Sequence, residues 1–246
     1  PREEAARAHA RALTRRKHPD SAAAWERLLA SQPQDPEALL LRAACVARTN
    51  AEAAPWPAMD SRPEAADPFL PAARHLASDL GPSAALAAIA ALQRGGALLP
   101  PAFALLEIEC HAQLGQWNDA ASRAAQVLHY PDLPAPHRLS ALLWRTAAAF
   151  QLQDSLLVEG SLQELLAATR DQPRQALEAA RWLDRAGLSD PSATLLAVAR
   201  KASDPEVRVE ALHRSLERTS RRRDAATTAT LARELLEIRP RDPAAR

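Results

Sequence analysis

The spacing of the prolines constrains the fold of this chain more than any other sequence feature. Proline inside a helix removes a hydrogen bond and clashes with the preceding turn, so twenty scattered prolines would prevent long helices. Seven of them instead stand just before runs with helical apolar spacing, at Pro36, Pro68, Pro101, Pro136, Pro173, Pro205 and Pro243. Their intervals are 32, 33, 35, 37, 32 and 38 residues, and Pro1 extends the series by another 35. The chain is therefore predicted to repeat one structural unit along its length.

Aspartate precedes four of these prolines, and this pair has a physical meaning at a helix start. The aspartate carboxylate accepts hydrogen bonds from free amide groups of the first turn, while proline at the first helical position loses no hydrogen bond. The pairs are Asp35-Pro36, Asp67-Pro68, Asp204-Pro205 and Asp242-Pro243, with Asp190-Pro191 as a further example inside a repeat. Each pair predicts the start of a helix.

Between successive starts the chain has room for two helices of about 12 to 15 residues joined by short turns, which is a helical hairpin. The second helices are expected at 21–31, 82–93, 117–129, 155–169, 189–201 and 224–238. The segment 51–66 is an exception because Pro55, Pro57 and Pro63 forbid a regular helix. We expect an extended loop or a short distorted helix there. Trp56 is interpreted as filling the gap left by the missing helix, with an exposed binding anchor as the alternative.

Composition agrees with a helical fold. Alanine, leucine, glutamate and arginine dominate, and only six glycines occur, so we predict an all-α protein without strands. The formal net charge of +1 offers no excess of cations for phosphates, which argues against a nucleic-acid partner. Lys17 and Lys201 are the only lysines, and this arginine bias is typical of a GC-rich bacterial genome. Because arginine grips carboxylates with two donors, an arginine-lined groove would suit an acidic partner.

A period near 34 residues with two helices per repeat resembles the tetratricopeptide repeat. The segment RLLASQPQDPEALLLRAACVARTN is similar to the end of one such repeat followed by the next first helix, and RELLEIRPRDPAAR near the C-terminus repeats its pattern. In QLGQWNDAASRAAQVL, Gly115 stands at the family's hairpin turn and Ala120 at its small packing position, and Gly187 is similar to another such turn. No first helix carries the tryptophan-leucine-glycine signature, since Arg42-Ala43 stands where leucine-glycine would be.

This resemblance implies a right-handed α-solenoid of stacked antiparallel helix hairpins, a TPR-like superhelix of about seven repeats that forms one domain over residues 1–246. Related helical repeats, such as those of superhelical enzyme scaffolds, are the alternative. The chain begins at Pro1 and stops just after a new helix start, so we expect it to be a piece of a longer protein.

The resemblance also implies a concave groove, lined by the first helices, that receives a peptide or helix of another protein. The candidate contacts are polar residues of those helices: Arg48, Glu109, Gln113, Arg145, Arg181, Arg185, Arg214 and Arg218. For any one of them, a solvated position on the outer face of an amphipathic helix is the alternative.

Signals for chemistry are missing from the sequence. No two of the seven histidines have the i, i+4 spacing of metal ligands on one helix, and no glycine-rich phosphate loop, G-x-S-x-G or HExxH motif occurs. Glu107, Glu109 and Asp184 are interpreted as charged helix surface rather than as acid-base pairs. The run 221–223 could contact an anion, but a solvated turn beside Asp224 is the simpler interpretation. We predict no catalytic residues, no metal and no cofactor.

Four tryptophans and both cysteines fall within apolar helical pattern. Trp25, Trp117, Trp144 and Trp182 are predicted to pack between repeats. Cys45 and Cys110 are predicted to be buried free thiols, since two cysteines far apart in sequence imply no disulfide framework.

The sequence thus favours a non-catalytic scaffold that binds a protein or peptide. The alternatives are a helical accessory or assembly domain of a larger enzyme or bacterial envelope complex, and a self-association module. No apolar run of about 18 residues predicts membrane insertion, and no signal-peptide pattern opens the chain. A soluble protein is expected, with the cytoplasm and the periplasm both left open.

Overall fold

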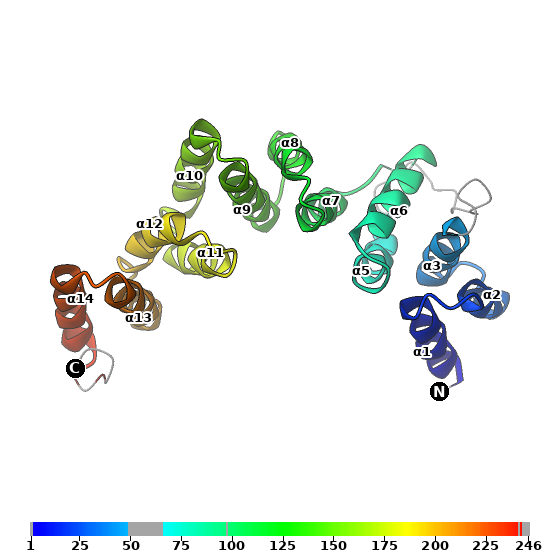
Figure 1. The fold of residues 1–246 in the computed structure, drawn as a ribbon, viewed down its shortest axis with the longest axis horizontal. Coiled ribbons are helices and arrows are strands. Elements are labelled where there is room, and N and C mark those ends of the chain that lie inside the picture. Colours follow the sequence, from blue (N-terminus) through cyan, green and yellow to red (C-terminus); the bar gives the residue numbers. More distant parts are fainter. Residues whose placement is uncertain (1, 49–65, 97, 241, 243–246) are drawn as a thin grey trace. The chain divides into compact units, whose positions relative to one another are not determined.

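The computed structural model describes residues 2–48, 66–96, 98–240 and 242, and within these residues all regular structure is helical (Figure 1). The all-α prediction is confirmed for this part of the chain. Residues 51–65 of the predicted irregular segment, with Trp56, lie outside the described residues, as does Pro243. The chain divides into two compact units, Pro1–His137 and Arg138–Arg246, and each is described by itself.

The first unit contains seven described helices, which follow one another in chain order. They are α1 (Arg2–Arg15), α2 (Ser21–Ser31), α3 (Pro36–Ala47), α5 (Phe69–Asp79), α6 (Pro82–Arg94), α7 (Pro101–Gln113) and α8 (Trp117–Leu128). The second unit takes in most of α9 and five further helices. These are α9 (Ala135–Gln151), α10 (Ser155–Thr169), α11 (Pro173–Arg185), α12 (Ser189–Ala199), α13 (Pro205–Arg221) and α14 (Ala225–Ile238).

The prolines mark the helix starts closely. Helices α3, α7, α11 and α13 begin at Pro36, Pro101, Pro173 and Pro205, while α5 and α9 begin within one residue of Pro68 and Pro136. The predicted carboxylate caps are present at Asp35, which accepts from the amide of Ala38, and at Asp204, which accepts from that of Glu206.

Two of the predicted caps are wrong. Helix α5 starts one residue later than expected, so Asp67 contributes its backbone carbonyl to the amide of Leu70. Helix α12 starts at Ser189, before Asp190, so the Asp190 carboxylate already lies inside the first turn and instead bonds to Arg222.

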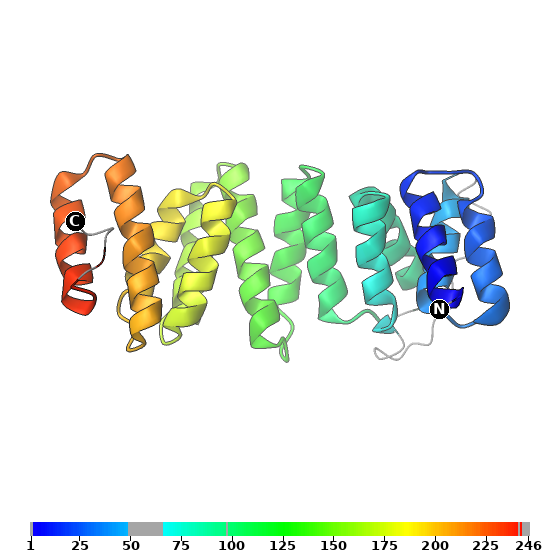
Figure 2. The same cartoon turned by 90° about the horizontal axis from the view of Figure 1, so that it is seen from below.

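Neighbouring helices pack in sequence order within each unit, as expected for a helical repeat. In the second unit, α11 contacts α13 and α10 contacts α12, so the first and second helices of the hairpins form two layers (Figure 1). Figure 2 shows the two helices of the α13–α14 hairpin, orange and red, lying side by side. The predicted handedness, the number of repeats and the single-domain organisation stay predictions.

Every described hairpin turn contains one residue with a positive φ angle. Glycine provides it in three turns, as predicted at Gly115 and Gly187, and a residue with a side chain provides it in three others. In chain order these residues are Lys17, Gly81, Gly115, Gln153, Gly187 and Arg223. From Gly81 onward the intervals are 34, 38, 34 and 36 residues, so the turns repeat with the same period as the prolines.

Small residues bring the helices close together. Fully buried alanines stand at helix contacts throughout both units, for example Ala73, Ala88, Ala124, Ala180 and Ala211. A methyl group at such positions lets two backbones approach, and the larger apolar side chains fill the space between hairpins. The core thus follows the repeat along the chain.

The cysteine prediction holds, and of the predicted tryptophan contacts between repeats the structure shows the one made by Trp144 and Trp182. Trp25 is fully buried, and its indole Nε1 donates to the Thr14 hydroxyl at 2.8 Å. Trp144 and Trp182 join α9 to α11 through an edge-to-face contact with ring centroids 4.9 Å apart. Trp117 is half-buried. Both cysteines are buried free thiols.

Candidate functional site

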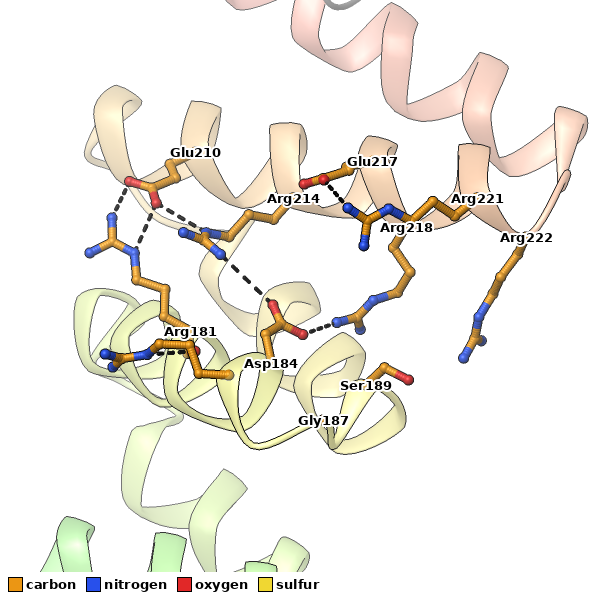
Figure 3. A pocket seen from close by; sticks show the side chains of 11 residues that line it. Arg181, Asp184, Gly187, Ser189, Glu210, Arg214, Glu217, Arg218, Arg221 and Arg222 are labelled. Atoms are coloured by element: carbon orange, nitrogen blue, oxygen red, sulfur yellow. Dashed lines mark hydrogen bonds and ion pairs between the residues drawn. The ribbon is translucent and has the colours of Figure 1, made fainter.

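The most distinctive surface feature lies in the second unit, where α11, the start of α12 and α13 surround a hollow of about 840 Å³ (Figure 3). We call it the arginine hollow. Six arginines line it together with Asp184, Glu210 and Glu217: Arg181, Arg185, Arg214, Arg218, Arg221 and Arg222. Four of the eight predicted groove residues, Arg181, Arg185, Arg214 and Arg218, are therefore brought together here.

Helical spacing places these side chains on one face. On α13, residues 210, 214 and 218 are four positions apart, and residues 217 and 221 lie three positions after 214 and 218. This spacing aligns all five along one stripe. On α11, residues 181, 184 and 185 form a matching group at the end of the helix. The apolar residues of both helices face the opposite way, with Leu183 and Leu212 fully buried, so packing of the core fixes the direction of the charged stripes.

Two carboxylates hold three of the arginines. Arg181 of α11 donates its Nε to Glu210 Oε1 at 2.8 Å, and Arg214 donates to the same oxygen at 3.1 Å. Asp184 of α11 is bonded to Arg218 and lies 3.8 Å from Nη1 of Arg214. Figure 3 shows the crossing: Arg181 extends from α11 to Glu210, and Arg218 extends from α13 back to Asp184.

The electrostatics of Glu210 reflect this arrangement. Burial alone would raise the pKa of its carboxyl group, but hydrogen bonds from Arg181 and Arg214 outweigh burial and bring the pKa below its usual value of 4.5. Glu210 is therefore ionised at neutral pH and holds both guanidinium groups in place.

Arg218 is the most enclosed cation of the hollow, with 13% of its side chain exposed. Its Nη2 donates to Asp184 and, at 3.0 Å, to the Ser192 hydroxyl, while its buried Nη1 has no hydrogen-bond partner. Buried polar atoms are nearly always paired in folded proteins, so this unpaired guanidinium nitrogen of a residue that lines the hollow is an exception.

Positive charge exceeds negative charge in the arginine hollow. Six arginines face three lining carboxylates, and Asp190 adds one more carboxylate from outside by pairing with Arg222. Arg185 has no carboxylate partner in the part of the chain that the structure describes, since its Nε donates to the Arg181 carbonyl at 3.4 Å. The local excess is therefore two positive charges, in a chain whose formal net charge is only +1.

The remaining predicted groove residues lie elsewhere. Arg48 donates to the Lys17 carbonyl at 3.0 Å at the end of α3, and Gln113 donates to Glu109 at 3.3 Å on the surface of α7. Arg145 is 12% exposed and bridges α9 to α10 by bonding to Glu164 at 2.8 Å and to Ser161 at 3.0 Å. Geometry makes Arg145 a helix-to-helix link within the second unit.

A second polar cluster, in the first unit, links three first helices. Glu37 of α3 accepts from Arg7 and Arg11 of α1 at 2.8 and 2.6 Å, and His75 of α5 lies 3.1 Å away. Burial alone would raise the pKa of Glu37, but the hydrogen bonds from Arg11 and Arg7 outweigh burial and lower it below 4.5. These groups satisfy one another, so the cluster supports the fold and offers little to a ligand.

Other chemistry finds little support in the described part of the chain. No group of three histidine, cysteine or acidic residues there could hold a metal ion. Burial raises the pKa of the Cys110 thiol to about 11, so it is a poor nucleophile at neutral pH. None of the described helices combines the length and the apolar character needed to cross a membrane.

No protein-family model matches the sequence, and no curated protein matches it. The described helices define the class as an all-helical protein with a repeat-like order of hairpins, and the arginine hollow is the feature that bears on its function.

Proposed function

We propose that the chain is a non-catalytic, tetratricopeptide-like scaffold that binds an acidic segment of another protein, and that the arginine hollow is its main contact. The right-handed solenoid of about seven repeats belongs to this proposal. The observation that carries it is the local excess of positive charge on the first helices α11 and α13.

The internal ion pairs support a binding role over a purely structural one. If the arginines served only to join α11 to α13, the carboxylates of Asp184 and Glu210 would need only two arginine partners. Instead Arg181, Arg214 and Arg218 share these two carboxylates, and Arg185 has no carboxylate partner among the described residues. Uncompensated cations in a concave site attract anionic partners and accelerate their association. An acidic segment would complete the pairing that the chain leaves incomplete.

The test is a capture of partners from a lysate of the source organism, comparing the wild-type chain with two charge-reversed variants. Arg185→Glu/Arg221→Glu changes two exposed arginines of the hollow. Arg170→Glu/Arg174→Glu makes the same change in charge at two exposed arginines outside the hollow and serves as the matched control.

We expect a partner with an acidic segment to be retained by the wild type and by the control, and lost from the hollow variant. Retention should weaken as salt rises from about 50 to 300 mM, because screening reduces the attraction between exposed charges. Equal capture by both variants, with unchanged circular dichroism and melting, would show that the hollow is not the contact.

A further inference from the structure

The geometry points to a phosphate monoester, carried by a phosphorylated side chain of the partner, as the group that the arginine hollow binds. This inference rests on the proposed function and narrows its acidic segment to a phosphorylated one. It starts from the two donors that the carboxylates of the hollow leave unsatisfied.

The first donor is Nη1 of Arg218, which is buried and has no hydrogen-bond partner. The second is the guanidinium of Arg185, whose Nε makes only a long bond of 3.4 Å to the carbonyl of Arg181. Arginine binds phosphate through paired N–H groups, and phosphate offers three acceptor oxygens that can engage more than one guanidinium at once.

Charge balance favours phosphate over a single carboxylate. The hollow has an excess of two positive charges once Asp190 is counted. A phosphate monoester carries about −1.5 to −2 at pH 7, which nearly cancels this excess, whereas one carboxylate would leave a positive charge uncompensated in a half-enclosed site.

The rim of the hollow adds further donors. Ser189, the first residue of α12, lines it with its hydroxyl group, and Leu188 before it supplies no side-chain cap for the helix. The start of α12 therefore brings partial positive charge to the same edge that Arg222 borders. The Ser189 hydroxyl and the start of α12 add to the positive potential of the arginines, and without the arginines they would not form a binding site.

The experiment titrates the 246-residue chain with matched short peptides and follows binding by calorimetry and by amide chemical shifts. The probes are a blocked glycine-alanine pentapeptide with one central phosphoserine, a twin with one glutamate, a twin with two adjacent glutamates, and inorganic phosphate. We expect the phosphoserine peptide to bind at least about tenfold more tightly than either glutamate twin.

Affinity should also rise about tenfold between pH 5 and pH 7, because the second phosphate proton is lost near pH 6. Arg185→Glu should weaken binding at least about tenfold, and Ser189→Asp should do the same by placing a negative charge at the rim. Both positions are exposed and outside any described ion pair, so the fold should persist. Arg174→Glu, on the same helix but outside the hollow, is the control and should bind normally.

Equal binding of the phosphoserine and two-glutamate peptides would overturn the inference, as would binding that Arg185→Glu and Ser189→Asp leave unchanged. If inorganic phosphate binds as tightly as the phosphoserine peptide, the inference that the phosphate belongs to a phosphorylated side chain is overturned. The two proposals can fail separately. If a partner is lost from the hollow variant but is still captured by the wild type after phosphatase treatment, the scaffold is supported and the binding of a phosphorylated side chain is contradicted.

Discussion

Glu210 of α13 receives Arg181 from the facing helix α11 and Arg214 from its own helix, with both guanidinium groups on one oxygen at 2.8 and 3.1 Å. The carboxylate therefore fixes two side chains that would otherwise repel each other. It sets the geometry of the arginine hollow and links two hairpins of the second unit.

Replacing Glu210 with glutamine should loosen this link. Because Arg181 and Glu210 are each more than one-third exposed, we expect the free energy of unfolding to fall by only about 0.5–1 kcal/mol. Urea denaturation followed by circular dichroism measures the change. Glu217→Gln, at a carboxylate that is 62% exposed, should change stability by less than about 0.3 kcal/mol. Equal losses in the two variants would contradict the role of Glu210.

The Glu37→Gln substitution should cost more. Glu37 is 12% exposed, and its loss leaves Arg7 and Arg11 of α1 without their shared partner. We expect a decrease of about 2 kcal/mol in the free energy of unfolding, less than for a fully buried pair because the arginines reach water. Glu26→Gln, which removes a surface pair with Arg42, is the control. A loss below about 0.5 kcal/mol would mean that the cluster is not a structural link.

The stability that Glu37 provides should depend on pH. Its pKa lies below 4.5 in the folded protein, so the ionised form is favoured by folding. Its contribution is therefore complete above the unfolded pKa and is lost as pH falls through the folded pKa. The difference in unfolding free energy between the wild type and Glu37→Gln should shrink as the pH falls below about 4.5. A difference that grows on acidification would reverse the assigned sign.

Both cysteines should resist modification in the native protein. Cys45 and Cys110 are buried, and at pH 8 the Cys110 thiol, with a pKa of about 11, is ionised in only about one molecule in a thousand. A chromogenic disulfide reagent should detect almost no thiol in the folded chain and two per chain in urea. The Cys110→Ala variant shows which of the two thiols gives each part of the reagent signal. Rapid reaction of Cys110 in the absence of urea would contradict its burial.

The contact between Trp144 and Trp182 should contribute to the packing of α9 on α11. A double-mutant cycle with Trp144→Leu and Trp182→Leu should give a coupling energy of about 0.5–1.5 kcal/mol, typical of edge-to-face pairs. The near-ultraviolet circular dichroism of either single variant should also lose the signal of the pair. Additive stability changes, within about 0.3 kcal/mol, would show that the rings are not coupled.

The helices could be predicted well from the sequence because their signals are local. Proline at the first helical position and helical apolar spacing act within a few residues, and α2 and α10 begin and end at the predicted residues. Asp190 shows the limit of this logic. The backbone of α12 already turns at Ser189, and the carboxylate is drawn to Arg222 from the next hairpin, which no local pattern reveals.

The site was harder to predict because it depends on which helices face each other. The sequence predicts Arg181, Arg214 and Arg218 on first helices, but their pairing with Asp184 and Glu210 requires the packing of α11 on α13. One signal is present in the sequence: Glu210, Arg214 and Arg218 recur every four positions, which indicates a single charged stripe. Arg145 also lies on a first helix, yet it bonds to Glu164 and Ser161 of α10.

The six hairpin turns in the described part of the chain share one feature of the backbone. Each of these turns has one residue with a positive φ angle, which is Lys17, Gln153 or Arg223 in three of them and glycine in the other three. A search for regularly spaced glycines would find only half of the turns. What the described turns share is therefore the shape of the backbone, while the type of residue that adopts it differs from one turn to the next.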